Sequence, residues 1–349
     1  MTKEKVAVIG GTGFLGSHIV LQLLEAGYTP IAIARRPERI AEALPGVEVE
    51  VRYGDLVEID SLRSALKGCT KVFCVAAMMQ EIYTSRSPNH REDAIRTNVQ
   101  GTLNALRAAA EQGIRRAVVT STSATRYQVD GSVATEDSPP TDPSIIDDAY
   151  VHSKLREHPA VAAFARETGL EVMTILPGGF FGPGMVADGM MGRGVLDIMN
   201  GRMPVSLDGA FQFTDVRDVA RAHILAMERG APGRDYLVVA TTLPLRDLFG
   251  TISRMTGMPE PRLYLPGGLM MGVAYATELI AGLRGAAPTI TRGMLKHTAI
   301  GQRFDCSRAQ QELGLTFRPV ETTLRDTVVS LVERGLAPHL EERMLATGK

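Results

Sequence analysis

Apolar runs of strand length alternate with amphipathic runs of helix length along the first half of the chain. The predicted strands cover residues 5–10, 29–35, 48–54, 71–77, 115–122 and 171–177. The predicted helices cover residues 15–26, 62–66, 98–112 and 150–167. Nearly continuous apolar strands that alternate with helices are typical of a parallel sheet covered on both faces. Right-handed crossovers then predict a doubly wound α/β sheet.

The alternation stops after Pro177. Residues 178–208 are rich in Gly and Met, and eleven of the sixteen methionines lie between residues 176 and 300. Flexible Met side chains suit an adaptable apolar pocket, although they also fill ordinary cores. We therefore expect an α/β domain over residues 1–177, to which 211–240 return, and a smaller, mostly helical lobe over 178–210 and 241–349.

Composition excludes several classes of partner. The 38 basic and 39 acidic residues nearly cancel, which disfavours binding to nucleic acid or to an acidic membrane. Three cysteines, Cys69, Cys74 and Cys306, are too few and too widely spaced for a disulfide framework or a metal site. The N-terminus enters a strand without the apolar region of a signal peptide. We expect a cytoplasmic protein that binds a small molecule and no metal.

One apolar segment, residues 266–285, is long enough to need comparison with a membrane span. Glu278 and Arg284 interrupt it, so its uninterrupted apolar run is shorter than the roughly 20 apolar residues that a span needs. We expect a helix that packs on the core or borders an apolar pocket.

Glycines follow the first predicted strand at a regular spacing. Gly10, Gly13 and Gly16 form a G-x-x-G-x-x-G pattern just before the first predicted helix. Glycine permits a tight turn and close approach of a pyrophosphate, and the following helix offers unpaired N–H groups. The position between a first strand and a first helix indicates a dinucleotide site and a Rossmann fold.

The next two strand ends bear on the identity of the dinucleotide. Arg35 and Arg36 lie at the end of the second strand, where NAD-binding sheets usually place a carboxylate. Arg suits a 2′-phosphate, so we predict NADP(H), with a solvated basic turn as the alternative. Asp55 and Leu56 follow the third strand and are expected to contact the adenine, unless Asp55 only caps a helix.

Polar residues with catalytic potential lie further along the chain. Tyr150 and Lys154 are four residues apart on one face of a predicted helix, a spacing that is common by itself. Ser123 ends the fifth strand 27 residues upstream, at the edge where open α/β sheets bind ligands. Chain order therefore allows Ser123, Tyr150 and Lys154 to meet above the cofactor.

Further motifs occur in a characteristic order. After the glycine pattern come "GDL", "CVAA", "RTNVQGT", "TSTSA", "YVHSK" and "FTDVRDVARAH". Together they resemble the extended short-chain dehydrogenase/reductase superfamily over nearly the whole chain. Within it the chain is most similar to the dihydroflavonol-4-reductase and 3β-hydroxysteroid dehydrogenase-like branch, which includes bacterial proteins called hopanoid-associated sugar epimerases. The resemblance also allows a homodimer formed by helices from the middle of the sheet.

The resemblance implies roles for individual residues. Tyr150 would exchange a proton with the substrate oxygen while hydride moves to or from the nicotinamide. A free phenol has a pKa of about 10, so Lys154 would lower the pKa of Tyr150 and hold the nicotinamide ribose. Ser123 would orient the substrate oxygen, with Thr122 as a less favoured substitute. Asn98 would support a water relay near Lys154.

The predicted site residues form three groups. The candidate catalytic residues are Ser123, Tyr150, Lys154 and Asn98. The candidate cofactor-binding residues are Gly10, Thr12, Gly13, Phe14, Leu15, Gly16, Arg35, Arg36, Asp55, Leu56, Ala76, Ala77, Tyr150, Lys154, Pro177 and Phe180. The candidate substrate-binding residues are Met78, Met79, Tyr83, Phe181 and Met185. Structural roles are expected for His152, His223, Asp215 and Asp218.

Two positions depart from the sugar-nucleotide members of the superfamily. Those members have Asn shortly after the sixth strand, where this chain has Gly179, and a pyrophosphate-binding Arg where it has Phe211. The changes favour an NADP(H)-dependent oxidoreductase that interconverts a ketone or aldehyde and an alcohol on a bulky, largely apolar substrate. This substrate would be aromatic, terpenoid or steroid-like. The alternatives are an NAD(P)-dependent sugar epimerase or dehydratase and a non-catalytic NADP(H)-binding regulatory protein.

Overall fold

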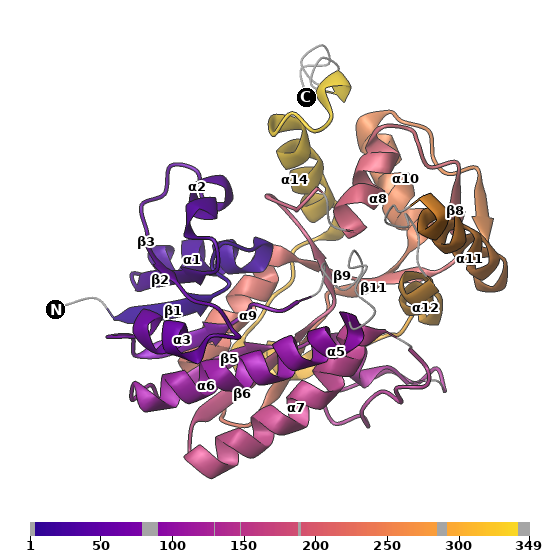
Figure 1. Cartoon of the computed structure of the whole chain (residues 1–349). Coiled ribbons are helices and arrows are strands. Elements are labelled where there is room, and N and C mark those ends of the chain that lie inside the picture. Colours follow the sequence, from indigo (N-terminus) through magenta and orange to yellow (C-terminus); the bar gives the residue numbers. More distant parts are fainter. Residues whose placement is uncertain are drawn as a thin grey trace.

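The computed structural model describes residues 4–78, 90–128, 130–146, 148–187, 190–284 and 292–340. Its main sheet contains β1 (Lys5–Ile9), β2 (Thr29–Ala34), β3 (Glu50–Tyr53), β4 (Lys71–Cys74), β5 (Arg116–Thr120), β6 (Glu171–Pro177) and β10 (Asp235–Val238). These seven strands are parallel and lie in the order β10-β6-β5-β4-β1-β2-β3 (Figure 1). The six strands predicted from the sequence are all present, with ends that differ by a few residues.

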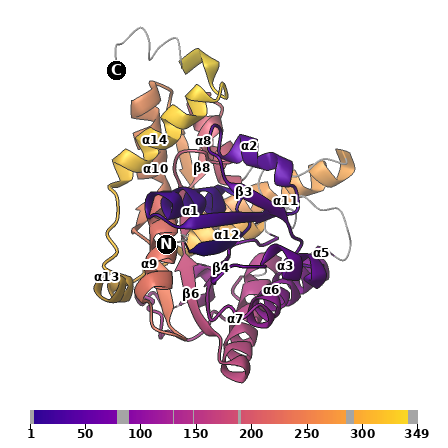
Figure 2. The same ribbon diagram turned by 90° about the vertical axis from the view of Figure 1, so that its left-hand side faces the viewer.

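Helices cover both faces of the main sheet, which confirms the predicted doubly wound architecture (Figure 2). One face is covered by α1 (Phe14–Glu25), α9 (Val216–Arg229) and α13 (Ser307–Leu313). The other is covered by α3 (Ile59–Ala65), α6 (Gly101–Glu111) and α7 (Ala149–Thr168). Alternate residues of each strand enter the two cores, as Val6 and Val8 do on one side and Ala7 and Ile9 on the other. Because both faces of the sheet are buried, each strand is a nearly continuous apolar run in the sequence.

The direction of winding reverses beside β1. From β1 the chain continues to β2 and β3 on one side, and it then crosses to β4 on the other side. Ile9, the last residue of β1, pairs with Ile33 of β2 and with Cys74 of β4. The glycine turn at Gly10 therefore lies at the topological switch point, where such sheets bind ligands.

A second lobe follows β6 and is largely helical. The lobe contains the strands β7 (Gly179–Phe181), β8 (Val205–Leu207), β11 (Thr241–Pro244) and β12 (Leu263–Leu265), and it shares a sheet with β9 (Ala210–Asp215), which leads directly into α9 of the main domain. Its helices are α8 (Met190–Met199), α10 (Leu245–Thr256), α11 (Gly267–Arg284), α12 (Arg292–Ile300) and α14 (Val320–Glu333). The strands form a β11-β9-β7 sheet and a β12-β8 pair. Residues 178–208 thus contain two short strands and a helix that sequence periodicity did not reveal. Shorter helices are α2 (Ile40–Ala43) and α5 (His90–Ile95).

Helix α11 occupies the apolar segment that was compared with a membrane span. Met270 and Ala274 are buried, as expected of a helix packed on the core. Leu269, Tyr275 and Leu279 are 62%, 57% and 55% exposed, so much of its apolar surface does not pack on the described residues. No helix of the described chain is long and apolar enough to cross a membrane.

Candidate active site

The glycine turn after β1 is shaped to admit a diphosphate. Gly10 has a φ of +95°, and a Cβ there would lie 2.9 Å from the backbone nitrogen of Ala76. A Cβ on Gly16 would lie 2.0 Å from the carbonyl oxygen of Gly10. The backbone of the turn is held by a 2.9 Å hydrogen bond from Gly13 N–H to Gly10 O, directly before α1. A backbone turn without side chains at a helix N-terminus fits the pyrophosphate of a dinucleotide.

A cavity of about 570 Å³ begins at this turn and reaches into the second lobe. Its size is within the range of small-molecule sites. Apart from Lys154, every predicted cofactor-binding residue lines it. The cavity therefore brings together strand ends and loops that are far apart in the sequence.

Several positively charged side chains line the end of the cavity at β2 and β3. Arg35, Arg36 and Arg39 line it together with Asp55 and Leu56. Arg39 was not predicted; it lies in the turn after β2, and its Nε is 3.5 Å from Oε2 of Glu42. Arginines at this strand end suit a 2′-phosphate. Asp55 is also part of a local turn, because its Oδ1 accepts a 3.0 Å hydrogen bond from Val57 N–H.

Ser123 and Tyr150 both line the cavity beyond the end of β5. Ser123 is 2% exposed and begins a short 3-10 helix, which Thr122 caps by accepting a 3.3 Å hydrogen bond from Ala124 N–H. Tyr150 lies in the first turn of α7, which Asp148 caps through a 3.0 Å hydrogen bond from Val151 N–H. The two hydroxyl-bearing residues that sequence analysis selected therefore line the same cavity.

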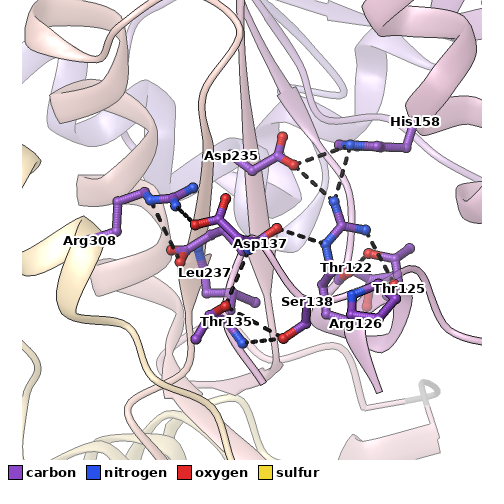
Figure 3. Close-up of polar contacts among 12 residues, drawn as sticks. Thr122, Thr125, Arg126, Thr135, Asp137, Ser138, His158, Asp235, Leu237 and Arg308 are labelled. Atoms are coloured by element: carbon purple, nitrogen blue, oxygen red, sulfur yellow. Dashed lines mark hydrogen bonds and ion pairs between the residues drawn. The ribbon is translucent and has the colours of Figure 1, made fainter. Parts of the chain in front are cut away.

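The 3-10 helix that begins at Ser123 is anchored by a buried polar network (Figure 3). Nη2 of Arg126 lies 3.0 Å from Oδ2 of Asp235 on β10 and 3.2 Å from Nε2 of His158 on α7. His158 Nε2 is also 3.1 Å from Oδ2 of Asp235. The Nε of Arg126 donates a 3.2 Å hydrogen bond to the carbonyl oxygen of Glu136. These contacts hold the Ser123 helix against two elements of the main domain.

Lys154 lies behind the cavity wall rather than on it. Its ammonium is 2.9 Å and 3.0 Å from the two carboxylate oxygens of Glu157, and both side chains are 2% exposed. Sequence analysis expected Lys154 to lower the pKa of Tyr150. In this arrangement the pKa of Tyr150 is raised, first by burial and then by the charges of Glu157 and Asp148. Glu157 compensates the lysine charge, and sequence analysis did not identify it.

Asn98 joins the start of α7 to the chain after β4. It lies in a π-helix, Arg96–Gln100, and is 1% exposed. Its Nδ2 donates to Ser153 Oγ at 2.8 Å and to Met78 O at 3.0 Å, and its Oδ1 accepts from Met78 N–H at 2.7 Å. All three contacts fix backbone or side chains next to the candidate proton donor. A water relay through Asn98 stays a prediction.

Thr120, the last residue of β5, is held by a buried histidine. Its Oγ1 lies 2.7 Å from Nε2 of His223, and the Nδ1 of His223 lies 2.8 Å from the carbonyl oxygen of Val219. A carbonyl only accepts, so Nδ1 carries the proton and Nε2 accepts from Thr120. Burial lowers the pKa of His223 to about 4, so the ring is neutral at pH 7. His223 therefore supports the strand end.

The wall that faces the second lobe is mostly apolar. The candidate substrate-binding residues Met78 and Met185 line the cavity, as do Phe180, Val186 and Met191. The predicted residues Met79 and Tyr83 lie outside the described residues. Phe181 lies behind the wall.

The aromatic side chains behind this wall pack on one another. Phe181 is 2% exposed and stacks on Phe213, with their ring centroids 5.1 Å apart. The ring of Phe211, which lines the cavity, contacts Gly179 so closely that a Cβ on Gly179 would lie 2.0 Å from Phe211 Cζ. The two departures from sugar-nucleotide enzymes are thus physically coupled, because only glycine leaves space for this ring.

Two polar groups of the wall were missed by sequence analysis. Tyr127 and Gln212 both line the cavity, and the Tyr127 hydroxyl donates a 3.0 Å hydrogen bond to Oε1 of Gln212. They lie 85 residues apart in the chain, so no local sequence pattern connects them.

A Gly-rich turn at a topological switch point, together with a cavity that Ser123 and Tyr150 line, is the arrangement of a dinucleotide-binding α/β protein. The sequence profile of the NAD dependent epimerase/dehydratase family matches residues 6–239, and the chain belongs to that family. The resemblance to extended short-chain dehydrogenase/reductases is thereby confirmed. The protein is an NAD(P)-dependent oxidoreductase of this family.

Curated relatives match over almost the whole chain. "Sterol demethylase protein B" of Methylococcus capsulatus is 32% identical over 94% of this chain and 98% of its own length. A "putative dihydroflavonol 4-reductase" of Synechocystis is 32% identical over 92% of each chain. "Tetraketide alpha-pyrone reductase 1" of Arabidopsis thaliana is 28% identical over 95% of this chain and 97% of its own length.

Solved structures support the same fold. The crystal structure of gox2253 is 30% identical, covers 95% of this chain and 99% of its own, and superimposes with a TM-score of 0.81. UDP-glucose 4-epimerase of Thermotoga maritima, solved with UDP-glucose, has a TM-score of 0.75, is 21% identical, and covers 95% of this chain and 99% of its own. At that identity the second similarity supports the fold alone.

Proposed function

We propose that the protein is an NADP(H)-dependent reductase or dehydrogenase that interconverts a ketone or aldehyde and an alcohol on a bulky, largely apolar substrate. The observation that carries this proposal is the composition of the cavity. Arg35 lines one end, Ser123 and Tyr150 line the middle, and Phe211 lines the wall toward the second lobe. A cationic end, a proton donor and an apolar wall are the three requirements of such a reaction.

The proposed chemistry assigns one step to each hydroxyl. The nicotinamide, when bound, supplies or accepts the hydride at the carbonyl carbon. The Ser123 hydroxyl would donate a hydrogen bond to the substrate oxygen and orient it. Tyr150 would give the proton to that oxygen in reduction and remove it in oxidation. Hydride plus proton converts the carbonyl to the alcohol, so the reaction balances.

The apolar substrate class rests on the contact between Gly179 and Phe211. The ring occupies the space that any side chain at position 179 would need, and it presents carbon atoms to the cavity. A charged sugar diphosphate would gain no polar partner from this surface. The names of the relatives point to the same class, since they include a sterol, a dihydroflavonol and a pyrone.

We also propose that the chain divides into a dinucleotide domain, residues 1–177 with 211–240, and a substrate lobe, residues 178–210 with 241–349. Support comes from the cavity, which lies between the main sheet and the second lobe and receives Met185 and Thr298 from the latter. Substitutions that alter substrate preference would then lie in the substrate lobe, and those that alter cofactor preference would lie in the dinucleotide domain.

The proposal is tested by incubating the protein with NADPH or NADH and a panel of aromatic, terpenoid and steroid carbonyls. We expect turnover with NADPH, and Tyr150→Phe should reduce it by about 10²–10⁴-fold because the proton donor is lost. Tyr236→Phe is the matched control, since it removes a buried hydroxyl that bonds Glu312, away from the cavity. Tightly held NAD(H) released on denaturation, with no net turnover on any carbonyl, would instead support a sugar epimerase or dehydratase.

A further inference from the structure

A buried ion pair lies on α7 one turn beyond Tyr150. Lys154 donates to both carboxylate oxygens of Glu157, at 2.9 Å and 3.0 Å, and to the carbonyl oxygen of Thr120, at 2.9 Å. An ammonium group has three N–H donors, so these three acceptors occupy all of them. The lysine therefore has no donor left for another partner without breaking one of these contacts.

Glu157 is as deeply placed as its partner. It is 1% exposed, and its Oε2 accepts a weaker, 3.3 Å hydrogen bond from Thr102 on α6. A buried carboxylate is stable only with a charged partner or strong donors, and Lys154 supplies both. The two residues are three positions apart on α7, so their side chains meet without any help from the rest of the fold.

The charge of Glu157 acts against the role proposed for Lys154. A lysine beside a catalytic phenol lowers the pKa of that phenol through its positive charge. A carboxylate that contacts the same lysine with both oxygens cancels much of the effect of this positive charge on the phenol. The pKa of Tyr150 is raised by burial, and the Glu157 charge raises it further.

We propose that Glu157 is a positioning residue that compensates the Lys154 ammonium and thereby sets the pH at which Tyr150 exchanges its proton. This inference rests on the proposed function, in which Tyr150 is the proton donor. It adds a third ionisable group to the Tyr150 and Lys154 couple. Glu157 itself does not line the cavity and acts only through its neighbours.

The other ionisable groups near the pair are distributed over several elements. On α7, Asp148 acts on Tyr150 and His158 acts on Glu157. From β4, Cys74 faces the pair, and burial, followed by the Glu157 charge, raises the pKa of its thiol to about 12. The 3-10 helix contributes Arg126, 3.2 Å from His158. The packed helix α5 carries Glu92 and Asp93, and Asp93 pairs with Arg96 at 3.0 Å. Lys154 is the group in direct contact with Glu157.

The principal test is the pH dependence of the reaction with Glu157→Gln, which keeps the shape of the side chain and removes its charge. The limb of the pH–rate profile that is assigned to Tyr150 should move to lower pH by about one pH unit, both for reduction and for oxidation, since a neighbouring negative charge is lost. Glu157→Asp retains the charge and should restore the wild-type limb. Glu167→Gln makes the same change at an exposed position of α7 and serves as the control.

A second measurement needs neither substrate nor a folded Glu157 variant. The near-ultraviolet phenolate absorbance of the wild type minus that of Tyr150→Phe follows the ionisation of Tyr150 alone. We expect this phenol to titrate above the usual value of about 10, first because it is buried and second because the Glu157 charge compensates its lysine. Titration of Tyr150 near neutral pH in the protein without cofactor would overturn the proposal.

The outcomes separate this inference from the proposed function. If Tyr150→Phe retains full turnover, the proposed proton donor is wrong and this inference fails with it. If Tyr150→Phe is inactive while folded Glu157→Gln shows the wild-type pH limb, the proposed function stands and the role of Glu157 is refuted. A uniform loss of rate without a shifted limb also counts against it, because that is the behaviour of a purely structural residue.

Discussion

Asp235→Asn should destabilise the fold strongly, because it removes the carboxylate that anchors the Ser123 helix. The side chains of Arg126 and Asp235 are only 7% and 15% exposed, and Arg126 would keep its charge without this partner. Breaking a buried pair by removing one partner costs about 3–5 kcal/mol. The unfolding entropy of a 349-residue chain is about 0.7 kcal/mol/K, so Tm should fall by about 4–7 °C.

Thermal and urea unfolding followed by circular dichroism would measure this loss. The matched control is Glu111→Gln, which breaks the exposed pair with Arg63, whose side chains are 39% and 40% exposed. Water screens that pair, so its loss should leave Tm nearly unchanged. The double variant Arg126→Met, Asp235→Leu should recover part of the loss, since it leaves no uncompensated charge. A Tm change for Asp235→Asn no larger than that of the control would refute the reasoning.

Three further changes test other parts of the structure. Arg35→Ala should weaken NADPH binding by about 10–100-fold, because the charge-assisted hydrogen bond to the 2′-phosphate is lost, and it should leave NADH binding unchanged. Fluorescence titration measures the affinity for both nucleotides, and a surviving NADPH preference contradicts the phosphate assignment. Gly179→Ala should raise KM for apolar carbonyls, since the new Cβ would lie 2.0 Å from Phe211 Cζ. Adding Phe211→Leu should make space for this Cβ and lower KM again. An unchanged KM in the single variant argues against the contact between Gly179 and Phe211. The pKa of His223 is about 4 in the folded protein, which is below its value in the unfolded chain. The neutral, buried ring therefore stabilises the fold fully above the unfolded-state pKa, and this contribution to the free energy of unfolding is lost as pH falls toward 4. Urea unfolding of wild type should lose about 1.4 kcal/mol per pH unit more than His223→Gln over that range, and equal slopes would exclude this role.

The main sheet could be predicted because its signals are local. Each strand is a short apolar run, and each helix between strands has its own periodicity. Gly10 and Gly16 could be assigned for a similar reason, since the turn they form joins two adjacent elements. Tyr150 and Lys154 are also neighbours on one helix, and Ser123 follows a strand that was correctly located. All of these features depend on residues close together in the chain.

The second lobe was harder to predict because its pairings are distant. Strand β7 has three residues, too few to show alternation, and its partner β9 begins at residue 210, far along the chain. The same reason explains Tyr127 and Gln212, which meet only in the folded chain. Phe181 was predicted to contact the substrate. The geometry of β7 instead turns Phe181 into the core, since successive residues of a strand point to opposite faces.

Short-range spacing in the sequence encodes the doubly wound sheet, the dinucleotide turn and the candidate catalytic hydroxyls of Ser123 and Tyr150, so each of them could be predicted without the structure. Tertiary structure decided which charges and rings surround those hydroxyls. It buried the Lys154–Glu157 pair, so the carboxylate charge counteracts the effect of the ammonium on Tyr150 with little screening by solvent. It also set the ring of Phe211 on Gly179, where packing excludes any side chain. Electrostatic and steric effects of this kind depend on burial and distance, which local sequence patterns do not specify.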